Sequence, residues 1–255
     1  MGRKRAARFA AAIVVPIGLV AGIAGGAAAG GTGPEAVVIK GSGDVTGVVE
    51  RYRDELGADN GGEPSPFPSG RREINWDGVP DDLAAPNALP GDFFAARGAV
   101  LSTRGDHVAV SADADNPDGA AVRFGDLNDG YPDEFRTFSK ERLFSPVGSN
   151  VATIRFSVPG TDTPAGVRGF GAVYTDVDKK EGAAFEFFDT DGEKLGTFAV
   201  PRSKDGLSFL GVAYDEPIVG KVRIVYGTSK LGPDDSKRYD VAVMDDFIYG
   251  EPQPT

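Results

Sequence analysis

Two pairs of aspartates stand where their carboxylates could ligate a metal ion. Asp176 and Asp178 flank Val177 at the end of a strand-like run, and Asp245 and Asp246 interrupt the apolar run VAVMDDFIY. Adjacent residues of a strand point to opposite faces, so one of the second pair should face inward or lie at a sheet edge. A buried carboxylate is costly unless it is paired or bound to a metal. Because Ca²⁺ takes about six to eight oxygen ligands in tolerant geometry, these four aspartates predict a calcium site.

The same carboxylates have alternatives that need no metal. A salt bridge to Arg168 or Arg223 would neutralise a buried carboxylate, and a β-bulge would expose both members of the second pair. The run Asp189-Thr-Asp-Gly192 also offers carboxylates, but its spacing predicts a hairpin turn.

Aromatic residues beside polar ones suggest a surface on which sugars stack. Trp76, the sole tryptophan, lies between Asn75 and Asp77, whose side chains could hydrogen-bond sugar hydroxyls. More aromatic residues lie in the long connection over residues 126–146, and long loops are often functional. The predicted ligand-binding residues are Trp76, Asp77, Tyr131, Phe135 and Arg136. The alternative is that Trp76 packs in the core and that the loop phenylalanines pack beneath their own loop.

Glycoside hydrolysis needs only two carboxyl groups, so an Asp/Glu pair acting on polysaccharide is an alternative function. The candidate acids are Asp77, Glu134, Asp176, Asp178, Glu186 and Asp246. With 38 acidic residues in the chain, chance proximity of two of them is also expected. The composition excludes other chemistry. His107 is the only histidine and there is no cysteine, which rules out cysteine nucleophiles and zinc sites with two or more His or Cys ligands.

The first 29 residues have the pattern of a secretory signal peptide. Four basic residues precede an apolar run from Phe9 to about Ala24, and Ala27-x-Ala29 offers a cleavage site. A retained membrane anchor is the alternative, since the run approaches the roughly 20 residues that span a bilayer. Removing four of the 27 basic residues leaves 23 against 38 acidic ones, a net charge of −15. The signal peptide predicts a secreted protein, and the acidity predicts that it binds neither nucleic acid nor, after cleavage, membranes.

The rest of the chain alternates apolar and polar residues in short runs. In Val151–Val158, every second residue is apolar, which is the period of a half-buried strand. Similar runs continue to Tyr249, separated by Pro, Gly and Asp turn signals and without a long amphipathic helix. The pattern predicts an all-β fold, an antiparallel and jelly-roll-like β-sandwich. Its predicted core phenylalanines are Phe156, Phe185, Phe187 and Phe209.

One short helix is predicted outside the sandwich, near the amino end. Val45, Val49, Tyr52 and Leu56 fall on one helical stripe, and Gly57 closes it. The Pro- and Gly-rich residues 58–70 then read as a linker. The predicted organisation is a signal peptide at 1–29, a helix and linker at 30–70, the β-sandwich at 71–252 and a disordered tail at 253–255.

Several segments in combination resemble an uncharacterised family of exported bacterial β-sandwich proteins. They are RREINWDG, FRTFSKERLFSPVGSNV, VRGFGAVYTDVD, FEFFDTDGEKLGTFAVP, LSFLGVAYDE and VMDDFIYGEP. Many members of that family resemble PEP-CTERM-type extracellular proteins, although this chain lacks the Pro-Glu-Pro motif, spanning segment and basic tail of the sorted members. The resemblance implies export and assigns no activity to any residue. More loosely, the final Asp-Asp strand is similar to those of jelly-roll carbohydrate-binding modules, in many of which a last-strand Asp helps hold calcium.

These patterns favour a secreted, non-catalytic binding or surface module, with glycan as the expected ligand and Ca²⁺ as the expected structural ion. The alternatives are a polysaccharide hydrolase that uses an Asp/Glu pair and a purely structural or adhesive extracellular domain.

Overall fold

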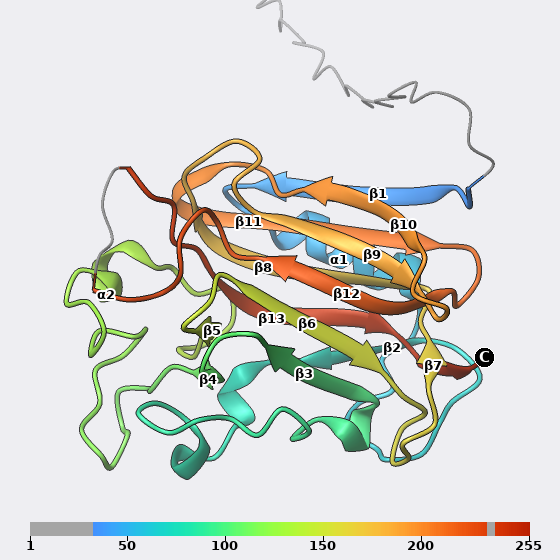
Figure 1. Ribbon diagram of the computed structural model, residues 1–255, viewed down its shortest axis with the longest axis horizontal. Coiled ribbons are helices and arrows are strands. Elements are labelled where there is room, and N and C mark those ends of the chain that lie inside the picture. The colour runs from blue at the N-terminus through green and yellow to red at the C-terminus, as the bar shows by residue number, and fades with distance from the viewer. Residues whose placement is uncertain (1–32, 234–237) are drawn as a thin grey trace, which may run out of the picture. The chain divides into compact units, whose positions relative to one another are not determined.

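Two antiparallel sheets lie face to face in the computed structural model, which describes residues 33–233 and 238–255 (Figure 1). In spatial order the first sheet contains β1 (Ala36–Ser42), β11 (Ser203–Tyr214), β8 (Gly169–Val177), β13 (Val243–Gly250), β5 (Phe144–Val147) and β4 (His107–Val110), and β2 (Arg71–Ile74) also pairs with β13. The second contains β10 (Lys194–Ala199), β9 (Ala184–Asp189), β12 (Val219–Val225), β6 (Val151–Phe156) and β3 (Ala99–Thr103). These are called the seven-stranded and the five-stranded sheet. The prediction of a mainly β fold with antiparallel sheets is confirmed.

Short elements complete the described part of the chain. They are β7 (Ala165–Gly166) paired with β14 (Gln253–Pro254), the helices α1 (Thr46–Leu56) and α2 (Tyr131–Glu134), and 3₁₀ turns at Trp76–Gly78, Asp81–Leu83 and Ala95–Arg97. The signal peptide predicted at 1–29 lies outside the described residues. Within the described ranges no helix is long and apolar enough to cross a membrane.

The main core lies between the two sheets. Alternate residues of each strand point into it, as the period-2 pattern predicts, and Phe156, Phe185 and Phe187 are all buried there. Phe170 of β8 meets Phe185 of β9 edge-to-face, with ring centroids 5.1 Å apart, so this contact joins the two sheets. The predicted hairpin is also confirmed, because β9 and β10 pair through a turn in which Gly192 N donates to Asp189 O at 3.2 Å.

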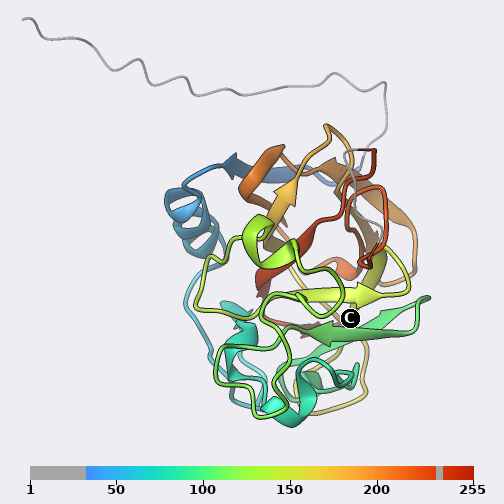
Figure 2. The same ribbon diagram turned by 90° about the vertical axis from the view of Figure 1, so that its left-hand side faces the viewer.

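A second, smaller core lies on the other face of the seven-stranded sheet, beneath α1 (Figure 2). The stripe of α1 that contains Val49, Tyr52 and Leu56 packs on outward-facing residues of the sheet. Phe209 belongs to this cluster, so it is buried as predicted but on the outer side of the sheet. Tyr52 fits because Gly211 has no side chain: a Cβ there would lie 2.5 Å from Tyr52 Cδ2.

The folded region begins earlier and ends later than the sequence predicts. β1 adds an edge strand to β11 with seven paired residues, so the fold includes residues well before Arg71. Residues 58–70 are not a free linker. Arg71 N donates to Ala58 O, and the buried Arg72 guanidinium donates to the carbonyl oxygens of Glu63 and Ser65. The predicted disordered tail instead forms β14. Proline and glycine in 58–70 shape this segment without separating it from the sheets.

Candidate functional site

Trp76 is a core residue and offers no ring face to a sugar. Its side chain is fully buried, stacks on Phe144 with centroids 4.3 Å apart, and donates from Nε1 to Asp245 O at 2.9 Å. The 3₁₀ turn at Trp76–Gly78 points Trp76 inward while the preceding Asn75 stays exposed. The prediction that Trp76 stacks on a glycan is therefore wrong, and its core alternative holds.

The aromatic residues of the long connection are buried as well. Tyr131 and Phe135 are both fully buried and stack on each other, with centroids 4.6 Å apart, in a third apolar cluster. Arg136 is exposed, and its backbone N–H donates a hydrogen bond to Thr175 Oγ1 at 2.7 Å. The five predicted ligand-binding residues thus form no common surface, because the rings pack beneath their loop.

Asp77 and the final-strand pair converge on one serine. Ser139 Oγ lies 2.7 Å from Asp246 Oδ1, 2.8 Å from Asp245 Oδ1 and 3.2 Å from Asp77 Oδ2. A hydroxyl group can donate only one hydrogen bond, so the second short contact requires a proton on one of the carboxyl groups. The loop around Ser139 is further fixed by Phe138 N, which donates to Asp245 Oδ2 at 2.6 Å.

The raised pKa values of Asp245 and Asp246 agree with a proton that their carboxyl groups share. Burial, and after it the charge of Asp246, raise the pKa of Asp245 to about 8. Burial also raises the pKa of Asp246. The bulge between Met244 and Phe247 in the pairing of β13 with β8 lets two consecutive aspartates face the same serine.

The four predicted calcium ligands do not come together. Asp176 accepts a hydrogen bond from Asp205 N at 2.7 Å, and Asp178 lies 3.5 Å from Lys204 Nζ. Both oxygens of Asp245 are taken by donors of the protein. Across residues 33–233 and 238–255, no group of three or more His, Asp or Glu side chains could hold a metal ion. The single four-aspartate site is therefore not formed, and calcium at either pair alone stays a prediction.

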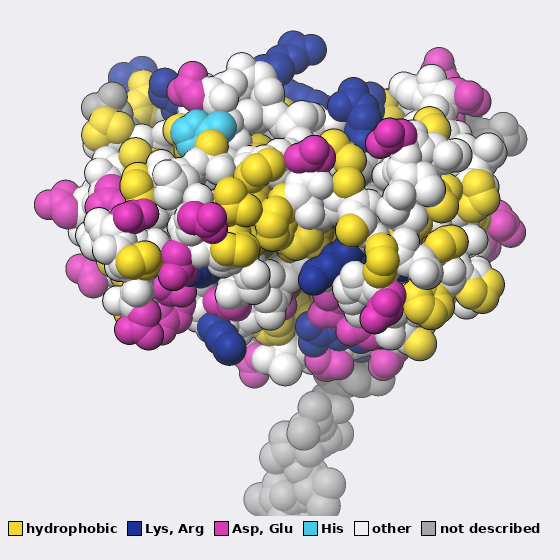
Figure 3. Space-filling view, turned by 90° about the horizontal axis from the view of Figure 1, so that it is seen from below, with side chains coloured by type: hydrophobic (Ala, Val, Ile, Leu, Met, Phe, Trp, Pro, Cys, Tyr) yellow, Lys and Arg dark blue, Asp and Glu magenta, His cyan; other side chains and the backbone are white. Residues whose placement is uncertain are grey.

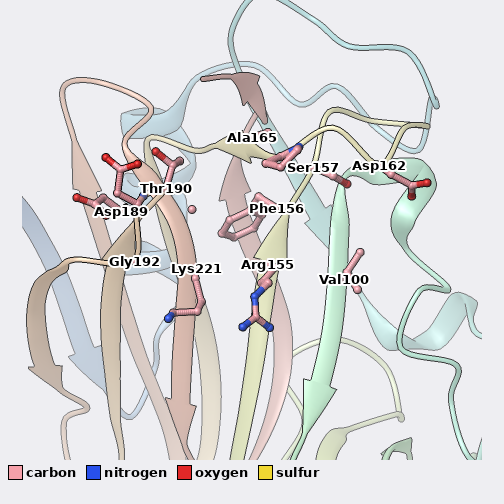
Figure 4. Close-up of a pocket in the computed structure, with 13 residues that line it drawn as sticks. Val100, Arg155, Phe156, Ser157, Asp162, Ala165, Asp189, Thr190, Gly192 and Lys221 are labelled. Atoms are coloured by element: carbon pink, nitrogen blue, oxygen red, sulfur yellow. Dashed lines mark hydrogen bonds between the residues drawn. The ribbon is translucent and has the colours of Figure 1, made fainter.

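A groove lies instead on the outer face of the five-stranded sheet. Two adjoining hollows of about 470 and 600 Å³ share Arg155 of β6 and Lys221 of β12. We call them together the sheet groove, and Figure 4 shows the smaller of the two. The smaller hollow, the acidic lobe, is bounded by Asp189, Asp191 and Asp162. The larger hollow, the basic lobe, is lined among others by Ser102, Arg104, Thr153, Arg155, Lys221 and Arg223, and no Asp or Glu lines it.

Strand register explains why the polar side chains of the groove form rows. Lys221 pairs with Arg155 on one side and with Phe188 on the other, so the three lie in one row across β9, β12 and β6. In the next row Arg223 pairs with Thr153, and Thr153 with Ser102 of β3. Directly paired side chains point to the same face, which for both rows is the face away from the core. Figure 4 shows Lys221 and Arg155 on neighbouring strands, with the amino group of Lys221 turned away from Arg155 toward Phe188 of β9.

The basic lobe contrasts with the charge of the chain, which carries a formal net charge of −11. Figure 3 shows a face of the protein where acidic side chains gather at one side, with basic side chains scattered between hydrophobic ones. The composition of this acidic protein does not explain why basic side chains gather in this lobe. They gather there because four cations fall on outward positions of neighbouring strands or at a strand end.

No protein-family model matches the chain, and no curated protein matches it. Two solved structures are similar to parts of it. A two-domain protein of unknown function from Bacteroides fragilis NCTC 9343 is 16% identical with a TM-score of 0.26, over 58% of this chain and 43% of that one. The enzymatically active domain of tailspike protein 4 from bacteriophage CBA120 is 12% identical with a TM-score of 0.25, over 69% of this chain and 22% of that one. The chain thus covers less than half of either structure, and likeness at this level carries no functional argument.

Proposed function

We propose that this protein is an exported, non-catalytic module that binds glycan in the sheet groove of a jelly-roll-like sandwich. The observation that carries the proposal is the groove itself, an open hollow over a sheet face lined by polar side chains from neighbouring strands. Hydroxyl groups of Ser102 and Thr153 and the charged groups beside them can hydrogen-bond sugar hydroxyls. In ligand-binding sites, a few well-placed polar groups fix the orientation of the ligand.

A glycan array probed with the full chain tests the proposal. The blocking variant is Thr153→Trp, which places a large ring in the middle of the basic lobe on a position that faces solvent. The matched control is Val38→Trp, on the exposed edge strand β1 of the other sheet. We expect binding to be lost in Thr153→Trp and kept in Val38→Trp. Absence of binding to every glycan would leave a structural or adhesive role as the better account.

One observation favours a second function, hydrolysis of polysaccharide. A separate hollow of about 640 Å³ is lined by Glu73, Asp246 and the partly exposed Phe93. One guanidinium nitrogen of Arg53 lies 2.6 Å from Glu73 Oε2 and 4.0 Å from Asp246 Oδ2, so the two carboxyl groups flank it. Burial raises the pKa of Asp246, which is the property of a general acid. Release of new reducing ends that disappears in Asp246→Asn would support this function, and no release by the unaltered chain would reject it.

A further inference from the structure

We infer that the basic lobe of the sheet groove binds an acidic glycan, whose uronate carboxylates contact Arg155, Lys221 and Arg104. The inference rests on the proposed glycan binding and names the ligand class. It concerns one part of the groove, and the acidic lobe plays no role in it.

The first argument is that the lobe places like charges opposite each other. Lys221 and Arg155 are directly paired across β12 and β6. Like charges at directly opposite positions destabilise a sheet. Such an arrangement is compensated when an anion lies between the two cations.

The second argument is that the protein supplies no anion of its own. Among the described residues, none forms an ion pair with Arg104, Arg155 or Lys221, whereas Arg223 in the next row is paired with Glu186 at 2.7 Å. The sequence has 38 acidic residues with which to neutralise a surface cation. Three cations without an ion-pair partner therefore surround one hollow and are available to an anionic ligand.

The third argument is the spacing of the cations. Lys221 lies on β12, Arg155 on the neighbouring β6, and Arg104 directly after the next strand, β3. Neighbouring strands are about 4.8 Å apart, and Arg104 lies four residues along the chain from Val100 of β3, the partner of Arg155, so a chain laid diagonally across the sheet meets positive charge on successive strands. A polyuronate carries one carboxylate on each sugar residue, which suits such a series. The guanidinium groups can bind carboxylate with two parallel hydrogen bonds.

Nucleic acid fits the lobe less well than an acidic glycan. Single-stranded nucleic acid is usually bound by aromatic rings on which bases stack. The only aromatic ring lining the basic lobe is Phe188, and Lys221 Nζ already lies over it, 3.9 Å from its centroid. The hydroxyl groups of Ser102 and Thr153 also suit sugar hydroxyls.

The test is titration calorimetry of the full chain with a hexamer of galacturonic acid and with the neutral hexamer of galactose. The variant is the double substitution Arg155→Gln and Lys221→Gln. The control is Lys40→Gln with Arg51→Gln, which removes the same charge from exposed positions on β1 and α1. We expect the acidic hexamer to bind at least tenfold more tightly than the neutral one. We also expect the first double variant, but not the control, to lose that preference. A tenfold change corresponds to about 1.4 kcal/mol.

Three outcomes would overturn the inference in different ways. Equal binding of both hexamers, or equal loss in the variant and the control, would reject the acidic ligand and leave glycan binding in place. Binding of neither hexamer, together with a blank glycan array, would reject both. A single-stranded oligonucleotide that binds through Arg155 and Lys221 as tightly as the acidic hexamer would show a general polyanion surface, which also contradicts the inference.

Discussion

Tyr52 of α1 lies on the bare backbone of Gly211 in β11, where a Cβ would come within 2.5 Å of the tyrosine ring. The hydroxyl group of Tyr52 donates to the carbonyl oxygen of Val212 at 2.9 Å. The helix therefore contacts the sheet at backbone level, and this contact requires glycine. Gly171 of β8 extends the same surface, since a Cβ on it would lie 2.6 Å from Tyr52 Cε1.

We predict that Gly211→Ala destabilises the protein by about 1–3 kcal/mol, the usual cost of overpacking. The added methyl group cannot avoid the fully buried Tyr52 ring without moving α1. Chemical denaturation of the purified variant measures the effect. Gly47→Ala is the matched control, because Gly47 is helical, exposed and has nothing within 4 Å of a Cβ. That change should stabilise by about 0.5–1 kcal/mol, and equal effects at both positions would contradict the contact.

A chain that starts at Arg71 should be far less stable than one that starts at Gly33. It lacks β1 and α1, which leaves the edge of β11 unpaired and exposes Phe209, Val173 and Ile248. Each large apolar side chain contributes about 1.5–3 kcal/mol when it is fully buried. Thermal melting of the two chains compares them directly. Melting at the same temperature would show that residues 33–70 do not contribute to the fold.

Much of the fold follows from the sequence because alternation along one strand is a local property. The runs VATIRF and KVRIV show which residues face inward, and they do so in the structure. Pairing between strands is not local. β1 joins β11 across more than 150 residues, and although its run Ala36-Val-Val-Ile39 is rich in β-branched residues, nothing in that run shows which strand it pairs with. Proline and glycine in 58–70 likewise indicate turns but do not show what those turns pack against.

The sheet groove could not be predicted for the same reason, because it depends on how separate strands pair. Arg155, Lys221 and Arg223 occupy outward positions of their strands, which the alternation indicates. Only the register between β6 and β12 brings Lys221 opposite Arg155. The aromatic residues led to a wrong prediction of the binding site, because their sequence neighbours do not show whether they are buried. Trp76 stands between polar neighbours in sequence, yet one 3₁₀ turn is enough to bury it.

Neutralising one partner of the ion pair between Arg72 and Glu251 should destabilise the protein more than the same change in any exposed ion pair. Both residues are buried, and Arg72 Nε lies 2.7 Å from Glu251 Oε2. Glu251→Gln leaves the buried guanidinium without its carboxylate, so we predict a loss of about 3–5 kcal/mol. Glu186→Gln is the control, since its pair with Arg223 is partly exposed and should contribute no more than about 1 kcal/mol. Denaturant midpoints measure both, and similar losses would contradict the difference in burial.

The proton shared by Asp245 and Asp246 makes the free energy of unfolding depend on pH. The pKa of Asp245 is raised in the folded protein to about 8 by burial and by Asp246, whereas in the unfolded chain it is near 3.9. Between these values the folded state binds more protons than the unfolded state. The contribution of this group is therefore fully present below about pH 4 and is lost as pH rises through about 8.

We predict that Asp245→Asn flattens the fall in stability between pH 5 and pH 8. The amide cannot ionise, while its oxygen can still accept the hydrogen bond from Phe138 N, which is 2.6 Å long in the native protein. Asp245 alone should contribute a loss of at most about 1.4 kcal/mol per pH unit over this range, in addition to the contributions of Asp176, Asp240 and Asp246, whose pKa values burial also raises. Urea denaturation at each pH measures the slope. Asp191→Asn, in the exposed β9–β10 turn, should keep the native slope. If the native chain and Asp245→Asn showed the same pH dependence, the short contacts of Ser139 with both carboxyl groups would need an explanation other than a shared proton.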